Sequence, residues 1–169
     1  MYSPSAYYLS GWLCSTLWML QYPIITSLIS FWSLDFNDSS ISNYMHWVST
    51  LLLSALQGST FGFMFGCICD DIDSAANIMT SFTSMVIYGC GVYVNLKTGP
   101  WYIKALGYIS PFRYLIEKLM RTLLKGLDYE DSICENYDWN YKQKVIPISL
   151  LFFIIFFFLS WVSIVLKAK

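Results

Sequence analysis

The residue types with the greatest potential for chemistry stand together in one short run, CICDDID, at positions 67–73. Thiolates and carboxylates at this spacing are candidate metal ligands, and an aspartate-rich run also suggests a site for magnesium and diphosphate. A zinc site usually needs four convergent ligands. The one histidine, His46, lies at the other end of the same apolar run, and no second acidic cluster follows. The run is interpreted as a solvated acidic turn between helices, and no metal site is predicted.

Motifs for nucleotide chemistry are also missing from the chain. No G-x-x-x-x-G-K-[ST] phosphate loop occurs in the sequence, and that loop is what cradles the phosphates of ATP. No catalytic residue is therefore predicted, and the chain by itself is not expected to be an enzyme. The net charge of −1, with no basic patch or stripe, argues against nucleic-acid binding.

The charged residues are segregated along the chain. They make up 12% of the sequence, against 56% hydrophobic residues, whereas a soluble domain has about 25% charged residues. Four stretches carry no charge at all, and each reaches the roughly 20 residues that cross a bilayer: 1–34, 39–69, 74–96 and 145–166. They predict four transmembrane helices, over residues 9–31, 44–68, 73–94 and 145–166.

Helices are favoured over barrel strands because runs such as SLLFFIIFFFLSW show no alternation of polar and apolar residues. The predicted fold class is therefore an all-α membrane protein. A cleavable signal peptide is not expected, since the first basic residue is Lys97 and such peptides begin with a basic region.

Two loops carry candidate modification sites. Asn37 begins an Asn-Asp-Ser sequence, which fits the acceptor pattern for N-glycosylation; the alternative is a polar turn that simply reverses the chain. Cys134 is the one cysteine in a polar loop, so it is either free or linked to another chain by a disulfide.

Three glycines of the second predicted span, Gly58, Gly62 and Gly66, follow one another at intervals of four residues. They lie on one face of a helix, and small residues at this spacing let two membrane helices approach closely. The pattern predicts a buried helix-packing face.

The segment 97–144 has mixed polarity. Breaks at Gly99-Pro100 and Ser110-Pro111 predict two short re-entrant helices, over 101–106 and 112–124, followed by a polar and aromatic loop on the membrane surface. Gly126 is a suitable helix terminator.

The sequence GCGVYVNLKTGPWYIKALGYISPFRYLIEKL (89–119) and the run YSPSAYYLS (2–10) resemble the membrane domain (ABC-2 type) of ATP-binding cassette transporters of the White or G type. The first run is similar to the end of that domain's fifth helix and its re-entrant helices. The second is similar to its cytoplasmic coupling helix, which would contain Tyr2, Ser3, Tyr7 and Tyr8. The four spans would then correspond to helices three to six of a six-helix domain.

This resemblance implies that residues 1–169 form a partial membrane domain without a nucleotide-binding domain. The chain is then either a truncated gene product or a part completed by another chain. It would need the second membrane half of a homo- or heterodimer and the ATPase domains, which bind ATP and Mg, and it would lie in the lipid bilayer of the plasma membrane or an organelle.

The resemblance also implies a function and its residues. The chain would form part of an export pathway for lipids, sterols or amphipathic xenobiotics. Its cavity wall would contain Thr80, Thr83, Ser84 and Ile87, its extracellular gate Val92 and Tyr93, and its re-entrant lid Arg113 and Glu117. Helix packing is the alternative role for the hydroxyl stripe, and an ordinary i,i+4 ion pair is the alternative for the two lid residues.

Two other functions are weighed against export. One is a structural or regulatory membrane subunit that transports nothing. The other is a small channel, which the lack of ionisable residues in the interiors of the spans argues against.

Orientation is a further expectation. An even number of spans places both termini on one side of the membrane, and the resemblance makes that side cytoplasmic. The positive-inside rule favours the reverse, because eight of the ten basic residues lie in 97–144. The cytoplasmic assignment is preferred because this segment also holds six acidic residues.

Overall fold

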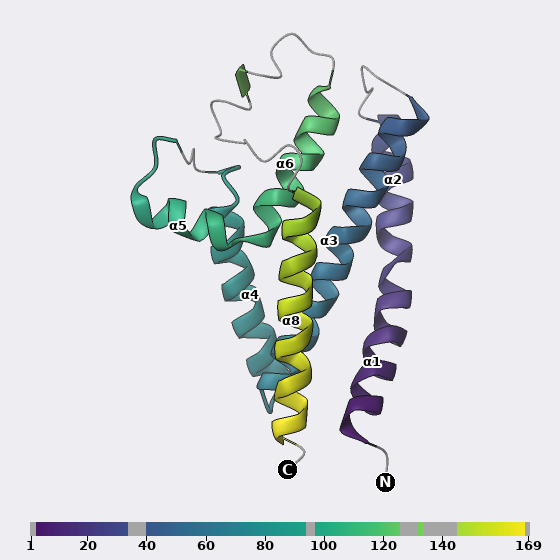
Figure 1. Ribbon diagram of the computed structural model, residues 1–169, viewed down its shortest axis with the longest axis vertical. Coiled ribbons are helices and arrows are strands. Elements are labelled where there is room, and N and C mark those ends of the chain that lie inside the picture. The colour runs from purple at the N-terminus through teal and green to yellow at the C-terminus, as the bar shows by residue number, and fades with distance from the viewer. Residues whose placement is uncertain (1–2, 34–39, 94–96, 126–131, 134–144, 168–169) are drawn as a thin grey trace.

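The computed structural model describes residues 3–33, 40–93, 97–125, 132–133 and 145–167. The elements of this part of the chain are all helices, and most run along the length of a tall bundle (Figure 1): α1 (Pro4–Met19), α2 (Gln21–Ser33), α3 (Ile41–Ile68), α4 (Ile72–Gly89), α5 (Trp101–Ile109), α6 (Pro111–Leu124) and α8 (Val145–Lys167). The all-α class predicted from the sequence is confirmed.

Three helical segments among the described residues are long and apolar enough to cross a membrane. They are Ser5–Ser33, which joins α1 and α2, Ile41–Ile68, which is α3, and Ile146–Lys167, which is most of α8. They match the first, second and fourth predicted spans. The third predicted span does not reach this standard, and its structure differs from the expectation in an informative way.

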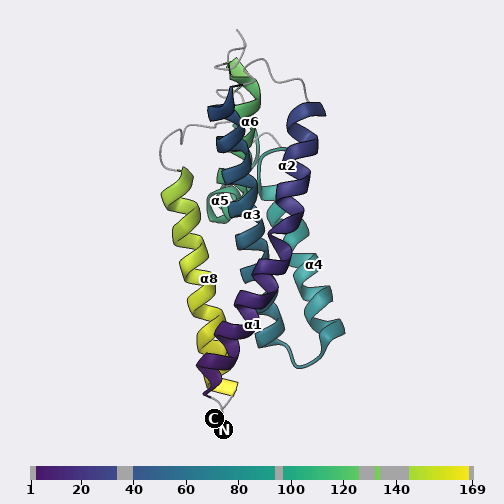
Figure 2. The same cartoon turned by 90° about the vertical axis from the view of Figure 1, so that its right-hand side faces the viewer.

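A proline explains the division of the first span into two helices. Pro23 has no N–H to donate, and its ring clashes with the carbonyl group four residues earlier, at Met19. Accordingly α1 ends at Met19, with Leu20 as its C-cap, and α2 begins at Gln21. The chain nevertheless continues in the same direction through this break (Figure 2).

Helix α3 is the centre of the bundle and packs against α1, α2, α4, α6 and α8. Figure 2 shows it running between α8 and α4. Near its middle the rings of Phe61 and Phe156 (α8) lie 4.2 Å apart between centroids. Gln57 is fully buried, and its Nε2 donates to the backbone oxygen of Ser149 at 2.8 Å. An apolar contact and a polar contact therefore join α3 to α8.

Helix α4 is shorter than the span predicted over 73–94. Its 18 residues cover about 27 Å, slightly less than the roughly 30 Å of a bilayer core. It ends at Gly89, and Gly91 follows with a φ of 84°, a value that residues with a side chain rarely adopt. The predicted end near residue 94 is thus wrong, because α4 ends at Gly89 and a glycine with a positive φ follows two residues later.

The two re-entrant helices predicted after this turn are present. Helix α5 lies across the long axis of the bundle, and α6 then continues toward the end opposite the chain termini (Figure 1). The α5 backbone passes so close to Gly89 that a Cβ atom there would lie 3.2 Å from the carbonyl carbon of Leu106. The re-entrant helices are therefore packed directly against the end of α4.

Both ends of the chain lie at one end of the bundle, together with the α3–α4 turn (Figure 1). There Lys167 Nζ donates to Asp70 Oδ1 at 2.6 Å and to the backbone oxygen of Cys69 at 3.2 Å. The carboxylate is exposed, and this hydrogen bond holds the pKa of Asp70 below its usual value. The charged end of α8 thus binds the acidic turn. The cytoplasmic location of this end stays a prediction.

Candidate functional site

The predicted cavity residues lie on α4, on the side that faces away from α3. Thr80, Ser84 and Ile87 are exposed and Thr83 is half-buried, whereas Val86 is buried in the bundle. Two of the three hydroxyl groups donate within their own helix, from Thr80 to Ala76 O at 2.7 Å and from Ser84 to Thr80 O at 2.8 Å. The stripe therefore presents methyl groups and oxygen lone pairs, which make a mildly polar and mostly apolar surface.

The predicted gate residues follow directly after α4. Val92 is 40% exposed and Tyr93 70% exposed. The ring of Tyr93 contacts that of Tyr88, with 5.9 Å between centroids. Val92 and Tyr93 lie in the turn between α4 and α5. Their role as a gate stays a prediction.

The turn is attached to the rest of the bundle by buried polar contacts. Cys90 is completely buried, and its Sγ lies 3.2 Å from Val86 O and 3.4 Å from Ser110 Oγ. Ser110 stands between α5 and α6 and is also buried. These contacts fix the end of α4 to the α5–α6 junction, so the re-entrant unit and α4 form one structural piece.

Buried charges on α6 are the most unusual feature of this unit. Arg113 is 1% exposed and Glu117 is fully buried. Glu117 Oε1 accepts a hydrogen bond from Arg121 Nε at 3.2 Å, while the guanidinium of Arg113 lies over the ring of Tyr108, 4.8 Å from its centroid. Besides Arg113 and Glu117, which were predicted from the sequence, the group of charged residues on α6 thus includes Arg121, which binds Glu117. Ionisable groups buried at membrane depth are costly and usually functional.

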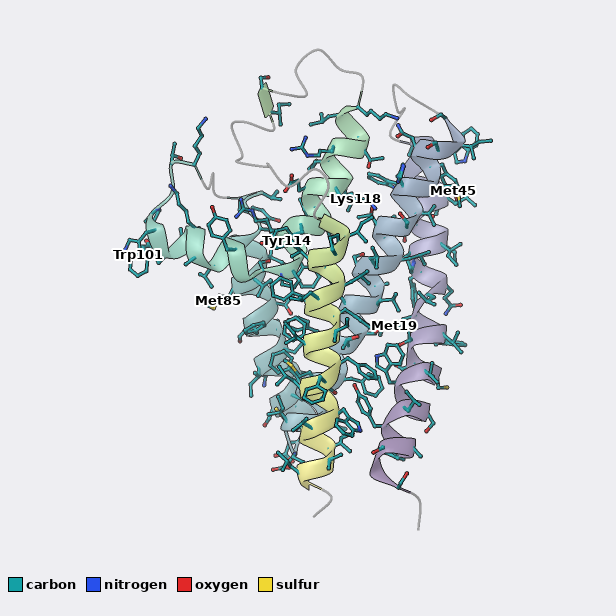
Figure 3. The ribbon with its side chains drawn as sticks, viewed as in Figure 1. Met19, Met45, Met85, Trp101, Tyr114 and Lys118 are labelled. Atoms are coloured by element: carbon teal, nitrogen blue, oxygen red, sulfur yellow. The ribbon has the colours of Figure 1, made fainter. Side chains whose placement is uncertain are left out.

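The surroundings of this charged group are aromatic and closely packed. Tyr114 is buried and donates from its hydroxyl to the backbone oxygen of Tyr108 at 3.1 Å, and its ring stacks near Phe152 of α8. Figure 3 shows Tyr114 where α5, α6 and α8 meet, and Trp101 at the far end of α5, away from the bundle. The unit is therefore anchored at its inner end and exposed at its outer end.

Two of the predicted coupling residues, Tyr7 and Tyr8, fall within α1, which continues without a break past residue 10. Ser3 is the N-cap and Tyr7 is 74% exposed, whereas Tyr8 is 2% exposed. The hydroxyl of Tyr8 lies 3.4 Å from the backbone oxygen of Phe157. Tyr8 thus holds α1 against α8, and Ser3 and Tyr7 remain candidates for contact with an ATPase domain. Tyr2 lies outside the described residues.

The glycine face of α3 differs from its prediction as a buried packing face. Gly58 is half-buried and Gly66 exposed, and a Cβ atom at either position would meet nothing within 4 Å. A Cβ atom at Gly62 would lie 3.8 Å from Met79 Cε of α4, so α4 approaches the middle of this face, while the space at Gly58 and Gly66 stays open. The glycine face instead lines a groove of about 860 Å³ between α1, α3 and the ends of α4 and α8. The spacing of the glycines predicted close packing. Spacing alone, however, does not show whether another helix covers the face.

The other candidate sites give little geometry. Among the described residues, no three His, Cys, Asp or Glu side chains come together in a way that could hold a metal ion. Cys67 lies beside Ser160 of α8, with 3.6 Å between Sγ and Oγ. Asn37 and Cys134 lie outside the described residues, so glycosylation and an interchain disulfide stay predictions.

Arg121, Gln57 and the Asp70–Lys167 pair were missed by sequence reasoning. A signal for Arg121 was available, because it follows Glu117 by four residues just as Arg113 precedes it by four. Gln57 stands as an isolated amide within an apolar run, which indicates a partner on another helix. The contact of Lys167 with Asp70 joins residues 97 positions apart, so no local signal could reveal it.

A bundle of apolar helices, interrupted by a re-entrant pair with buried charges, defines a polytopic membrane domain. Residues 1–124 match the model of the ABC-2 type transporter family. The chain therefore belongs to the ABC-2 type transporter family, whose members are membrane domains of ATP-binding cassette transporters and work with ATPase domains.

A curated relative agrees with this assignment. The chain is 25% identical over 99 residues to "ABC transporter G family member 15" of Dictyostelium discoideum. The match covers 59% of this chain and 7% of that relative, so the chain spans a small part of the relative's length. This similarity fits the resemblance to the G type that the sequence motifs indicated.

Proposed function

We propose that this chain forms part of the translocation pathway of an ATP-binding cassette exporter for lipids, sterols or amphipathic xenobiotics. ATP hydrolysis would take place in a domain outside this chain, in a complex with a second membrane half. The observation that supports this proposal is the exposed stripe on α4, which contains Thr80, Thr83, Ser84 and Ile87.

The chemistry of the stripe suits amphipathic substrates. Two of its three hydroxyl hydrogens are used within the helix, so the stripe presents weak acceptors among apolar groups rather than charges. Such a surface can hold an apolar molecule with a small polar group while demanding little loss of hydration. The turn with Val92 and Tyr93 would close the space at one end, and the buried charges of α6 would keep the re-entrant lid in one position.

The same residues admit a second role, as a structural or regulatory subunit that binds a transporter without forming a pathway. In that case the stripe on α4 would pack against a partner helix, since Ser and Thr are common in such interfaces. The two functions differ in whether the stripe must stay open.

A pair of matched substitutions separates them. Ser84 and Ser81 are both exposed on α4, and both donate within the helix, at 2.8 and 2.9 Å. Ser84 belongs to the stripe, while Ser81 faces a neighbouring side of the helix. The complex that forms around the full chain is purified, reconstituted into vesicles and tested for ATP-dependent uptake of a fluorescent phospholipid.

Ser84→Phe is expected to reduce the rate of uptake about tenfold or more, and a tenfold reduction corresponds to a rise of about 1.4 kcal/mol in the activation free energy of transport. Ser81→Phe is expected to leave the rate of uptake near that of the wild type. Equal uptake by the two variants would reject the cavity assignment. An assembled complex whose ATPase activity is normal but which transports nothing would favour the structural subunit. Vesicles that contain only this chain are expected to show no ATP-dependent uptake.

A further inference from the structure

The groove along the glycine face of α3 is separate from the stripe on α4 that the proposed function uses. Its floor is formed by small residues of two helices, Gly58, Gly62 and Gly66 of α3 with Gly11 and Ser15 of α1. Eight residues separate the first and last of the α3 glycines, so the floor is about 12 Å long. The volume of about 860 Å³ lies within the usual range of small-molecule sites.

The polarity of the groove changes from one end to the other. Phe63 and Met79 line its apolar length, whereas Asp70 and Lys167 line its mouth at the end of the bundle that holds the termini. Tyr7 also lines the groove, and its ring is 74% exposed. An apolar groove with a charged and aromatic mouth has the same polarity gradient as a membrane lipid, with its polar head group and its acyl chain.

The charges around the mouth indicate which head group fits. Asp70, Asp71 and Asp73 are exposed on the α3–α4 turn, and among the described residues of that turn and the adjoining end of α8 the basic group is Lys167, already bound to Asp70. The mouth is therefore acidic overall, and an exposed aromatic ring beside it can contact a cation through its face. An anionic head group would be repelled, whereas an amine or quaternary ammonium would be attracted.

We propose that this groove binds a membrane lipid with a cationic amine in its head group, with an acyl chain along the glycine floor and the amine at the acidic mouth. A bound lipid explains why the glycine face is open. A methyl group at Gly58 or Gly66 would enter the space of the acyl chain, whereas it would meet no neighbouring helix. The proposal concerns binding at a site away from the cavity wall, and it does not depend on transport.

The structure supplies variants that fill the groove without disturbing the bundle. A Cβ at Gly58 or Gly66 meets nothing within 4 Å, so Gly58→Leu and Gly66→Leu are expected to extend a side chain into the open groove. Thr26→Leu adds bulk to an exposed position of α2 and serves as the control. Unfolding in detergent is measured for each variant, so that a loss of binding is not confused with a loss of fold.

The full chain is reconstituted in vesicles of an uncharged glycolipid, whose head group has no amine, together with a small amount of photoactivatable phosphatidylethanolamine or of the phosphatidylglycerol analogue with the same acyl chain. After irradiation, labelled peptides are mapped. The expected result is preferential labelling of α1 and α3 residues of the groove by the amine lipid, reduced about tenfold in Gly58→Leu and Gly66→Leu, a loss equivalent to about 1.4 kcal/mol, and unchanged in Thr26→Leu.

A second arm tests the head group alone. Replacing both Asp71 and Asp73 with lysine leaves the groove open and reverses the charge of its mouth, so the preference for the amine lipid over the anionic lipid is expected to disappear or reverse. Labelling that ignores the head group, or that persists in the two leucine variants, would overturn the proposal. So would cross-linking of the groove to a second polypeptide helix with no lipid label, which would identify it as a protein interface.

Discussion

Glu117→Gln is the substitution that tests most directly how the re-entrant unit is held together. The change removes the negative charge but keeps the size and shape of the side chain. In the native protein Glu117 is fully buried, and Arg121, whose Nε lies 3.2 Å from Glu117 Oε1, has only 12% of its side chain exposed. The variant therefore removes the carboxylate that accepts this hydrogen bond, at a site where little water reaches the guanidinium.

The size of the effect follows from this burial. Removing one partner of a buried ion pair costs about 3–5 kcal/mol, because the remaining charge is left without compensation. A loss of that size is a large part of the roughly 5–15 kcal/mol that stabilises a typical domain. Asp70→Asn is the matched control, since Asp70 also binds a basic side chain but its carboxylate is 92% exposed, where an ion pair contributes little.

The measurement is reversible unfolding of the full chain in mixed micelles as the fraction of denaturing detergent rises, followed by tryptophan fluorescence. Glu117→Gln is expected to lower the free energy of unfolding by about 3 kcal/mol or more, and Asp70→Asn to change it slightly. Combining Glu117→Gln with Arg121→Gln should restore part of the loss, with a coupling energy of about 1–3 kcal/mol.

Equal unfolding free energies for Glu117→Gln and Asp70→Asn would refute the argument that burial makes this pair important. A double variant in which the two losses simply add would show that Glu117 and Arg121 do not stabilise one another.

Three further predictions concern the turns of the bundle. Gly91→Ala should lower the free energy of unfolding by about 1–2 kcal/mol, because residue 91 has a positive φ. Gly66→Ala, with open space around its Cβ, should raise the free energy of unfolding by about 0.5–1 kcal/mol. A loss of stability in both variants would contradict the backbone argument. Gly89→Ala should cost about 1–3 kcal/mol, since its Cβ would lie 3.2 Å from the α5 backbone, and an unchanged thermal midpoint would show that α5 moves freely. The hydrogen bond from Lys167 lowers the pKa of Asp70, so the wild type should be more stable than Asp70→Asn above pH 3.8. This difference in stability should vanish as the pH falls through the lower pKa of the native state. A difference that stays constant down to acidic pH would show that the Asp70–Lys167 pair does not cause it.

The sequence alone determined the class of the protein and most of its helices. Charge-free stretches at 39–69 and 145–166 are long enough to cross a bilayer, and an apolar segment of that length has few alternatives to a helix, so α3 and α8 follow directly. The re-entrant pair was also predictable, because Gly99-Pro100 and Ser110-Pro111 mark where each short helix begins.

The end of α4 was missed, although Gly91 is the same kind of local terminator that Gly126 was taken to be. Residues 74–96 carry no charge, so composition favours a helix through the whole stretch, yet α4 stops at Gly89. Gly91 follows this end with a positive φ, as a local glycine cap does, whereas the passage of α5 over Gly89 depends on where α5 packs.

The tertiary structure also decided which faces are covered. Equal spacing of Gly58, Gly62 and Gly66 shows only that they share one side of α3, and the placement of α1, α4 and α8 leaves that side open as a groove. In the same way Glu117 has an arginine four residues away on either side, and only the packing of α6 shows Arg121 Nε at 3.2 Å and Arg113 over Tyr108. Local spacing sets which side chains share a face, but burial and partners depend on helices distant in the sequence.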